Sequence, residues 1–157
     1  MPNHRTSRLP ALFAAATLGG LLLAGTAAAQ DVEKTVSYRQ GIFKALSWHI
    51  GPIAGMAKGE VPFDSATLQH HADGMAALAM LVHEGFPEGS GPIEGSRARE
   101  EIWTDPETFQ ARAANLAEQT AILAARAPFL TQETLGEALG AVGGACKACH
   151  DDFRAAN

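Results

Sequence analysis

The sequence predicts an all-α protein, and more specifically an antiparallel four-helix bundle. Apolar residues recur every three or four positions through most of the chain, whereas no segment alternates apolar and polar residues as a half-buried strand does. Glycine and proline clusters divide this pattern into four stretches of roughly 20–27 residues. No internal repeat is present, which argues against an array of repeated helix pairs. Four helices with three connections, packed into a single bundle, account for the pattern.

Residues 1–29 precede the bundle and have the organisation of a secretory signal peptide. They contain two arginines, no acidic residue, an apolar run from Leu9 to Ala24, and three alanines at 27–29. The alternative is a transmembrane anchor, but the run is shorter than the roughly 20 residues that a membrane-spanning helix needs. We therefore expect cleavage after Ala29, export to the periplasm, and one mature domain over residues 30–157.

The predicted mature domain is acidic. The full chain has 12 basic and 17 acidic residues, and the leader carries two of the basic ones, which leaves a charge of −7. A negative surface without a basic cluster argues against nucleic acid as a partner, and against an anionic membrane once the signal has been cleaved. The composition also excludes collagen-like, disordered and disulfide-rich classes.

The first helix is expected from Val32 to Gly59, because one apolar face runs through this stretch and Pro62 follows it. The residues of that inward face are Val36, Arg39, Phe43, Leu46, Ile50, Ile53 and Ala57. Pro52 lies inside the helix, where a proline removes a backbone hydrogen bond. We expect a kink after Gly51 or, alternatively, a break into two helices.

Asp64 or Ser65 can cap a second helix that ends near Gly85. Its inward residues are Leu68, His71, Met75, Leu78 and Val82. Residues 85–100 are rich in glycine and proline, which predicts a surface loop.

The third helix is expected to begin near Asp105, with Pro106 in its first turn, and to end at Pro128. Its inward residues are Phe109, Ala113, Leu116, Thr120 and Leu123. Thr131 can cap the fourth helix. The inward residues of that helix are Leu135, Leu139, Val142, Cys146, Cys149 and Phe153.

The segment from Cys146 to His150 is a C-x-x-C-H motif, which is typical of c-type haem attachment. Two thiols three residues apart lie on one flank of a helix and can form thioethers with the two vinyl groups of one haem, while the histidine can ligate its iron. A thioredoxin-type redox pair, a zinc site and a plain disulfide are the alternatives. The first lacks a βαβ context, the second lacks further ligands at a suitable spacing, and the third leaves His150 unexplained. We expect one haem c attached through Cys146 and Cys149.

Two further features of the helices suggest contact with a large group. Gly136, Gly140, Gly143 and Gly144 lie in the fourth helix, where each costs about 1 kcal/mol relative to alanine, so close packing of a helix or of the macrocycle is expected there. Arg39 lies on an inward face, where an unpaired charge is costly. A haem propionate is a natural bidentate partner, and the alternatives are a carboxylate or an extension into solvent.

The sequence resembles the cytochrome c′ family over essentially the whole mature chain. The haem motif lies at the C-terminal end, within the segment from Gly143 to Arg154, and Tyr38-Arg39-Gln40 lies near the start. Residues 57–60, 86–90 and 101–103 agree with the same family. Cytochromes c′ are four-helix bundles, so the resemblance implies the predicted fold.

The resemblance also implies residue roles. Cys146 and Cys149 would hold the haem, and His150 would be the proximal iron ligand. Arg39 and Gln40 match residues that contact the haem and its propionates. The basic residue four positions past the histidine, close to the proximal face, is Arg154. Arg97 or Arg99 in the loop is a further candidate for a propionate.

Position 43 decides the functional subtype within this resemblance. In the related low-spin cytochromes of the c-556 type this position is a methionine that supplies the sixth ligand, whereas here it is Phe43, which cannot ligate. Met56 lies about 20 Å of helix rise further along and should not replace it. Met75, Met80 and His71 remain alternative ligands.

These features predict a haem protein with a five-coordinate, high-spin iron under an apolar cover. Such a site suits the small diatomic gases NO and CO and the transfer of single electrons with a redox partner protein. Without a distal hydrogen-bond donor it does not suit enzymic peroxide chemistry, so we expect no enzyme. The alternative is a six-coordinate low-spin electron carrier of the c-556 type. Cytochromes c′ are often dimers through their first two helices, which leaves a homodimer open.

Overall fold

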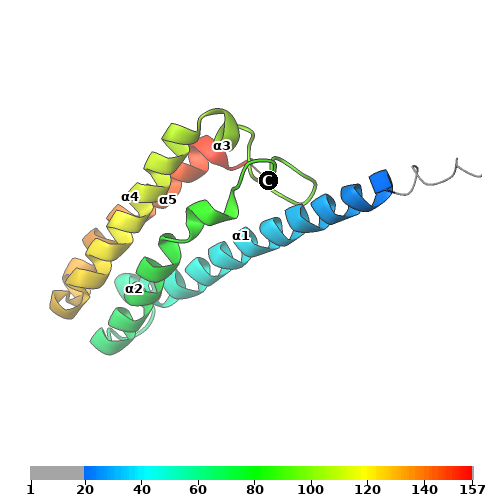
Figure 1. The fold of residues 1–157 in the computed structure, drawn as a ribbon. Coiled ribbons are helices and arrows are strands. Elements are labelled where there is room, and N and C mark those ends of the chain that lie inside the picture. Colours follow the sequence, from blue (N-terminus) through cyan, green and yellow to red (C-terminus); the bar gives the residue numbers. More distant parts are fainter. Residues whose placement is uncertain (1–19, 157) are drawn as a thin grey trace, which may run out of the picture.

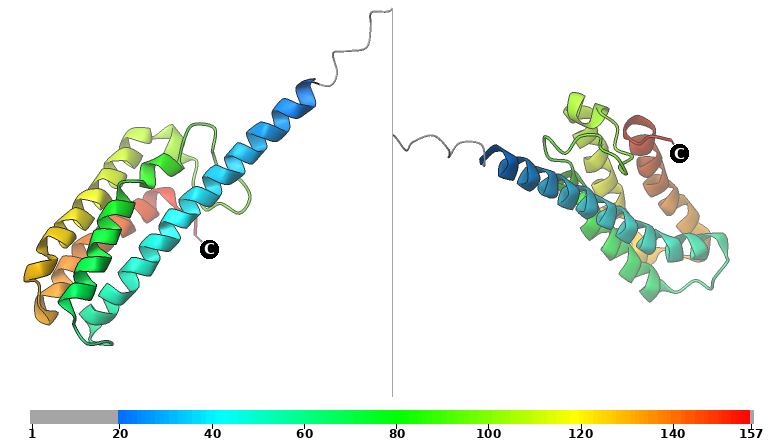
Figure 2. Two further views of the ribbon diagram at one scale, coloured as in Figure 1. Left: turned by 60° about the horizontal axis from the view of Figure 1, so that its bottom comes forward. Right: turned by 90° about the vertical axis from the view of Figure 1, so that its right-hand side faces the viewer.

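The computed structural model describes residues 20–156, with side chains from Asp31 onward. Four long helices form the bundle: α1 (Gly20–Lys58), α2 (Ser65–Ala79), α4 (Pro106–Arg126) and α5 (Gln132–Phe153). They pack in the cyclic order α1, α2, α4, α5, and the N-terminal part of α1 extends beyond the other helices (Figures 1 and 2). The predicted all-α four-helix bundle is therefore confirmed.

The predicted signal peptide falls largely outside the described residues. Only its last ten residues, 20–29, are described, as the first part of α1. Cleavage after Ala29 therefore stays a prediction. Among the described residues, no helix is both long and apolar enough to span a membrane.

Helix α1 runs through Pro52 without interruption, so the alternative of two separate helices is wrong. Its predicted inward face is buried at Val36, Arg39, Leu46 and Ile53, and half-buried at Phe43, Ile50 and Ala57. The helix ends at Lys58, where Gly59 takes a φ of +72° that suits glycine.

Helix α2 begins as predicted but ends earlier. The Asp64 carboxylate accepts a hydrogen bond from the backbone N–H of Thr67 at 2.7 Å. The helix stops at Ala79, and a separate 3₁₀ turn, η1 (Val82–Gly85), follows it. That turn brings Gly85 so close to α1 that an added Cβ would lie 2.5 Å from the Cβ of Arg39. The predicted extension of the helix to Gly85 is therefore wrong, because a contact with α1 shapes this segment.

The third predicted helix is confirmed as α4. Asp105 caps it, Pro106 occupies its first turn, and a 3₁₀ turn, η2 (Ala127–Phe129), contains Pro128. All five predicted inward residues are buried: Phe109, Ala113, Leu116, Thr120 and Leu123.

Helix α5 begins after Thr131, whose side chain takes part in a capping box with Thr134. Its most buried face includes Ala138 and Ala145, so the face is rotated slightly from the predicted one, and Leu139 is only half-buried. The four glycines of this helix are exposed, and a Cβ added to any of them would meet nothing within 4 Å. The expectation that a neighbouring helix packs closely against them is wrong.

The core of the described residues has two parts. The main cluster lies between the four long helices, whereas a smaller second cluster of Ile102, Phe109 and Phe153 lies near the C-terminal end of α5. The short helix α3 (Glu101–Thr104) contributes Ile102 to the second cluster. The candidate site lies at the boundary between these two clusters.

Candidate haem site

The two cysteines lie on α5, at the boundary between the core clusters. Both are free and half-buried; Cys146 packs against the main cluster and Cys149 against the second. Burial raises the pKa of both thiols, and the charges of Cys146 and Asp152 help to raise that of Cys149 to about 11. A thioredoxin-type pair needs a lowered thiol pKa, so this environment disfavours that alternative.

His150 follows in the last turn of α5 and is exposed. Partial desolvation, together with the positive charges of Arg154 and Arg97, lowers the pKa of its imidazole. A lowered pKa favours the neutral ring, which is the form in which a histidine binds a metal.

A row of aromatic rings connects α1 to the second cluster. Phe43 contacts Phe86 with ring centroids 6.4 Å apart, Phe86 contacts Phe109 at 4.9 Å, and Phe109 contacts Phe153 at 5.3 Å. Trp103 lies 6.2 Å from Phe86. Because Cys149 packs against the same cluster, one cysteine and the aromatic row share one end of the bundle. Phe43, half-buried, presents only a hydrocarbon ring there.

Arg39 is buried in this region, with 3% of its surface exposed. Its guanidinium donates to the carbonyl oxygens of Gly85 and Ser90 and to the hydroxyls of Ser90 and Ser96, at 2.9–3.4 Å. It also lies 5.1 Å from the ring centroid of Phe86 and 5.9 Å from that of Trp103. Burial lowers its pKa, and it forms no ion pair with a carboxylate of the described residues. Neither predicted alternative, a carboxylate partner or extension into solvent, is therefore present.

Arg39 and Gln40 both attach the loop before α3 to α1. The Gln40 amide donates to the carbonyl oxygen of Gly95 at 3.1 Å, next to the Arg39 contact at Ser96. Sequence reasoning missed the role of Ser90, which is buried and donates to the carbonyl oxygen of Pro87 at 2.7 Å. A serine in a glycine- and proline-rich stretch carries no local signal of burial.

The remaining predicted basic residues lie around the C-terminal segment. The Arg97 guanidinium donates to the Ala155 carbonyl oxygen at 2.6 and 3.0 Å. Arg99 pairs with Glu101, and its backbone N–H donates to the Phe153 carbonyl oxygen at 3.0 Å. Arg97 and Arg99 therefore already hold this end of the molecule together.

Arg154 is exposed, and its backbone bridges Ala98. Its guanidinium charge acts on His150 by lowering the pKa of that ring. The structure thus brings Arg154 close to the predicted proximal ligand.

The alternative iron ligands are engaged elsewhere or exposed. The sulfur of Met56 accepts a hydrogen bond from the backbone N–H of Asp64 at 3.4 Å, in the connection between α1 and α2. Met75 is buried in the main cluster, and Met80 is 66% exposed. The ring of His71 lies against that of His49.

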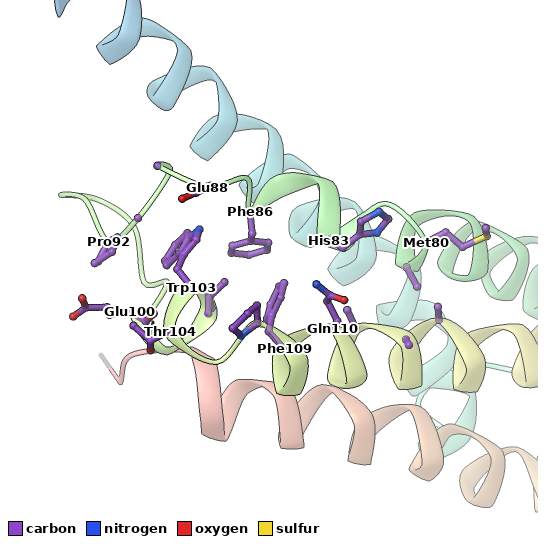
Figure 3. Close-up of a pocket in the computed structure, with 18 residues that line it drawn as sticks. Met80, His83, Phe86, Glu88, Pro92, Glu100, Trp103, Thr104, Phe109 and Gln110 are labelled. Carbon is purple, nitrogen blue, oxygen red and sulfur yellow. Dashed lines mark hydrogen bonds between the residues drawn. The ribbon is translucent and has the colours of Figure 1, made fainter.

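A cavity of about 950 Å³ lies beside the aromatic row. Phe86, Trp103 and Phe109 line it together with Met80 and His83, as Figure 3 shows. None of its lining residues comes from α1 or α5, so the cysteines and Arg39 do not line it.

The described residues fit a covalently bound haem. Two free thiols lie on one flank of a helix at the boundary of two apolar clusters, and the pKa of the histidine that follows them is lowered, which favours its metal-binding form. The buried charge of Arg39 has no carboxylate partner among the described residues, and a haem carries two carboxylates.

Comparison with known proteins also indicates a haem protein. The family model described as Cytochrome C' matches residues 34–154. A cytochrome c′ of Cereibacter sphaeroides is 39% identical over 135 residues, which cover 84% of this chain and 90% of that protein.

Solved structures agree as well. A cytochrome c′ from Rhodobacter spheriodes has a TM-score of 0.75 and 36% identity, covering 80% of this chain and 98% of that one. A nitric oxide complex of a variant cytochrome c′ from Alcaligenes xylosoxidans has a TM-score of 0.73 and 32% identity, covering 80% and 97%.

Proposed function

The chain belongs to the cytochrome c′ family, and from this premise we propose that it is a periplasmic haem protein whose five-coordinate, high-spin iron binds NO or CO and carries single electrons. Proteins of this family bind haem c covalently through cysteines, and Cys146 and Cys149 are the two cysteines of this chain. A haem with one protein ligand supplies an open coordination position and a one-electron redox couple. The residues around it decide which ligands enter that position.

His150 is proposed as the proximal ligand. Its place directly after the second cysteine and the lowered pKa of its ring support this role. Arg154, whose charge contributes to that lowered pKa, is proposed to keep the ring neutral on the proximal side.

Arg39 and Gln40 are proposed to face the propionates. The support is the buried guanidinium of Arg39, which has hydrogen bonds but no counter-charge among the described residues. A propionate would supply the missing negative charge and form charge-assisted hydrogen bonds. Because the same two side chains hold the loop before α3, the loop and the haem would be positioned together.

The identity and packing of Phe43 are the main support for a gas-binding iron. By the family resemblance it matches the α1 position at which the c-556 type has a ligating methionine. Phenylalanine cannot ligate, and this ring packs edge-on against Phe86. An apolar ring excludes water and offers no hydrogen bond to a bound oxyanion or peroxide. Neutral diatomic gases are therefore the ligands that this cover admits best. The Alcaligenes relative solved as a nitric oxide complex supports the same choice.

The test is the visible and EPR spectrum of the purified ferric protein. High-spin signals are expected for the wild type. In Phe43→Met the spectrum should shift toward low spin, because the new thioether can ligate the iron if position 43 covers it. Ile42→Met is the matched control: this neighbouring residue is buried in the main cluster and should leave the spin state unchanged. A wild-type low-spin spectrum with a methionine–iron charge-transfer band would support the six-coordinate electron carrier instead.

We further propose that the protein is not an enzyme. Phe43 packs against Phe86 and the apolar main cluster, and its ring can neither donate nor accept the protons on which peroxide cleavage relies. Turnover of peroxide with a simple dye at enzymic rates would overturn this assignment.

A further inference from the structure

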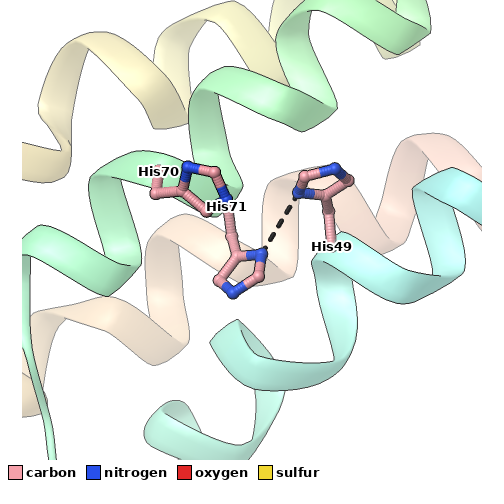
Figure 4. Close-up of side chains that lie close together, drawn as sticks. All are labelled: His49, His70 and His71. Carbon is pink, nitrogen blue, oxygen red and sulfur yellow. Dashed lines mark hydrogen bonds between the residues drawn. The ribbon is translucent and has the colours of Figure 1, made fainter.

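Three histidines from two helices gather at a site separate from the cysteines. His49 lies on α1, and His70 and His71 are adjacent on α2 (Figure 4). The ring centroids are 5.2 Å apart between His49 and His71, 5.9 Å between His49 and His70, and 5.1 Å between His70 and His71. His49 and His71 are half-buried, whereas His70 is exposed.

The spacing of the ring nitrogens suits a metal ion. The Nδ1 atoms of His49 and His71 are 3.1 Å apart, and one nitrogen from each of the three rings lies within 4.8 Å of the others. Nitrogen ligands of a tetrahedral zinc ion are about 3.4 Å from one another, given Zn–N distances of 2.0–2.1 Å. The His49–His71 pair already has nearly this separation. His70 is exposed, so its ring is free to rotate toward the other two.

Gly74 makes room for this arrangement. A Cβ added to Gly74 would lie 2.3 Å from Cε1 and 2.6 Å from Nδ1 of His49, so the imidazole rests directly on the backbone of α2. A glycine in the middle of a helix weakens that helix, and here its absence of a side chain is what admits the ring. The placement of His49 therefore depends on a residue outside the histidines themselves.

We propose that His49, His70 and His71 bind one divalent transition-metal ion of the Zn²⁺ or Cu²⁺ class, which links α1 to α2. Imidazole nitrogen suits both ions, and three protein ligands leave a fourth position for water. His49 lies six residues beyond Phe43, about 9 Å of helix rise, so the ion would occupy a site of its own. Desolvation and the neighbouring imidazoles also lower the pKa of His71, which favours the neutral, ligating form.

The experiment titrates Zn²⁺ into chelator-treated holoprotein by calorimetry at neutral pH, with Cu²⁺ in a parallel series. One ion per chain is expected, together with a rise in the thermal unfolding midpoint. His49→Ala and His71→Ala should each weaken binding at least tenfold. His83→Ala is the matched control, because His83 is an exposed histidine outside the cluster and its loss should change nothing.

Gly74→Ala gives a sharper test because it keeps all three histidines. The added methyl group should displace the His49 ring and weaken Zn²⁺ binding, while the haem spectrum and the helical circular dichroism stay as in the wild type. The proposal is overturned if Zn²⁺ does not bind, or if His49→Ala and His71→Ala bind it as well as His83→Ala does. One ion per two chains, with dimer formation on addition of Zn²⁺, would also overturn a site within one chain.

Discussion

Outside the haem motif, the buried Arg39 is the side chain that most strongly indicates contact with the haem. It is the one charged residue of the inward α1 face, and the structure buries it almost completely. Its guanidinium donates to neutral oxygens of the loop before α3 and lies near the faces of Phe86 and Trp103, but no carboxylate of the described residues neutralises its charge. An uncompensated buried charge is costly, so a chain that keeps this arginine is expected to pair it in the holoprotein.

The first prediction concerns Arg39→Gln. Loss of hydrogen bonds from a charged donor should lower the free energy of unfolding by about 2–3 kcal/mol, as measured by equilibrium denaturation. It should also lower the haem midpoint potential in a redox titration, because a positive charge near the haem favours the reduced form. Arg126→Gln removes an exposed arginine at the far end of α4 and should leave both values unchanged. Equal effects of the two changes would contradict the role of Arg39.

At the scale of elements, the packing of η1 on α1 explains where α2 ends. The pattern of apolar residues continues through Val82, which is buried as predicted, yet the backbone changes to a 3₁₀ turn. The bare backbone of Gly85 then lies against the Cα and Cβ of Arg39. Nothing local in the sequence distinguishes this close approach from an ordinary helix end.

Gly85→Ala should therefore destabilise the protein by about 1–3 kcal/mol, because the new methyl group has no space and α1 or η1 must move. Gly91→Ala is the control, since a Cβ at Gly91 meets nothing within 4 Å. Its effect should stay within about 0.5 kcal/mol. Urea denaturation of the two variants measures the difference, and similar midpoints would show that the contact is looser than described.

The start of α2 makes a prediction about pH. Asp64 caps the helix, and its hydrogen bond from Thr67 lowers the pKa of its carboxyl group. A lowered folded-state pKa means that the stabilisation is present above the ordinary value and is lost as the pH falls through the lowered one. Asp64→Asn keeps a capping side chain but cannot titrate. Its thermal midpoint should depend less on pH below about 4 than that of the wild type, and parallel pH profiles would argue against the cap.

For the molecule as a whole, the sequence predicted features that depend on neighbouring residues, but it did not predict contacts between different helices. The face and caps of α4 and the haem motif could be read from spacing alone, because each depends on residues within a few turns. The partners of Arg39 and the grouping of His49 with His70 and His71 depend on how far one helix is shifted along another. That shift is set by the packing of the whole core, and it cannot be inferred from any single segment of the sequence.

The aromatic residues of the bundle show why the haem matters to the whole molecule. They make up only 6% of the chain, yet Phe43, Phe86, Phe109 and Phe153 form one row at the end that contains Cys149. Phe43 and Phe86 also pack against the main cluster, but its buried members contain no aromatic ring, and Ile53, Leu68, Leu135 and Val142 are among the most buried. The helices should therefore form without the haem, whereas the end that carries the cysteines should be incomplete.

The double change Cys146→Ser and Cys149→Ser tests this division. Circular dichroism should retain most of the helical signal, because the buried residues of the main cluster are all kept and only Cys146 at its edge is changed. Thermal unfolding should begin at a lower temperature, since a group bound only by the folded state stabilises that state. Acidic acetone should extract any haem from this variant but none from the wild type. Ala148→Ser, between the two cysteines on the same half-buried turn, is the control that should keep its haem. If the double variant unfolded at the wild-type temperature, the aromatic row would be stable by itself and the haem would serve function alone.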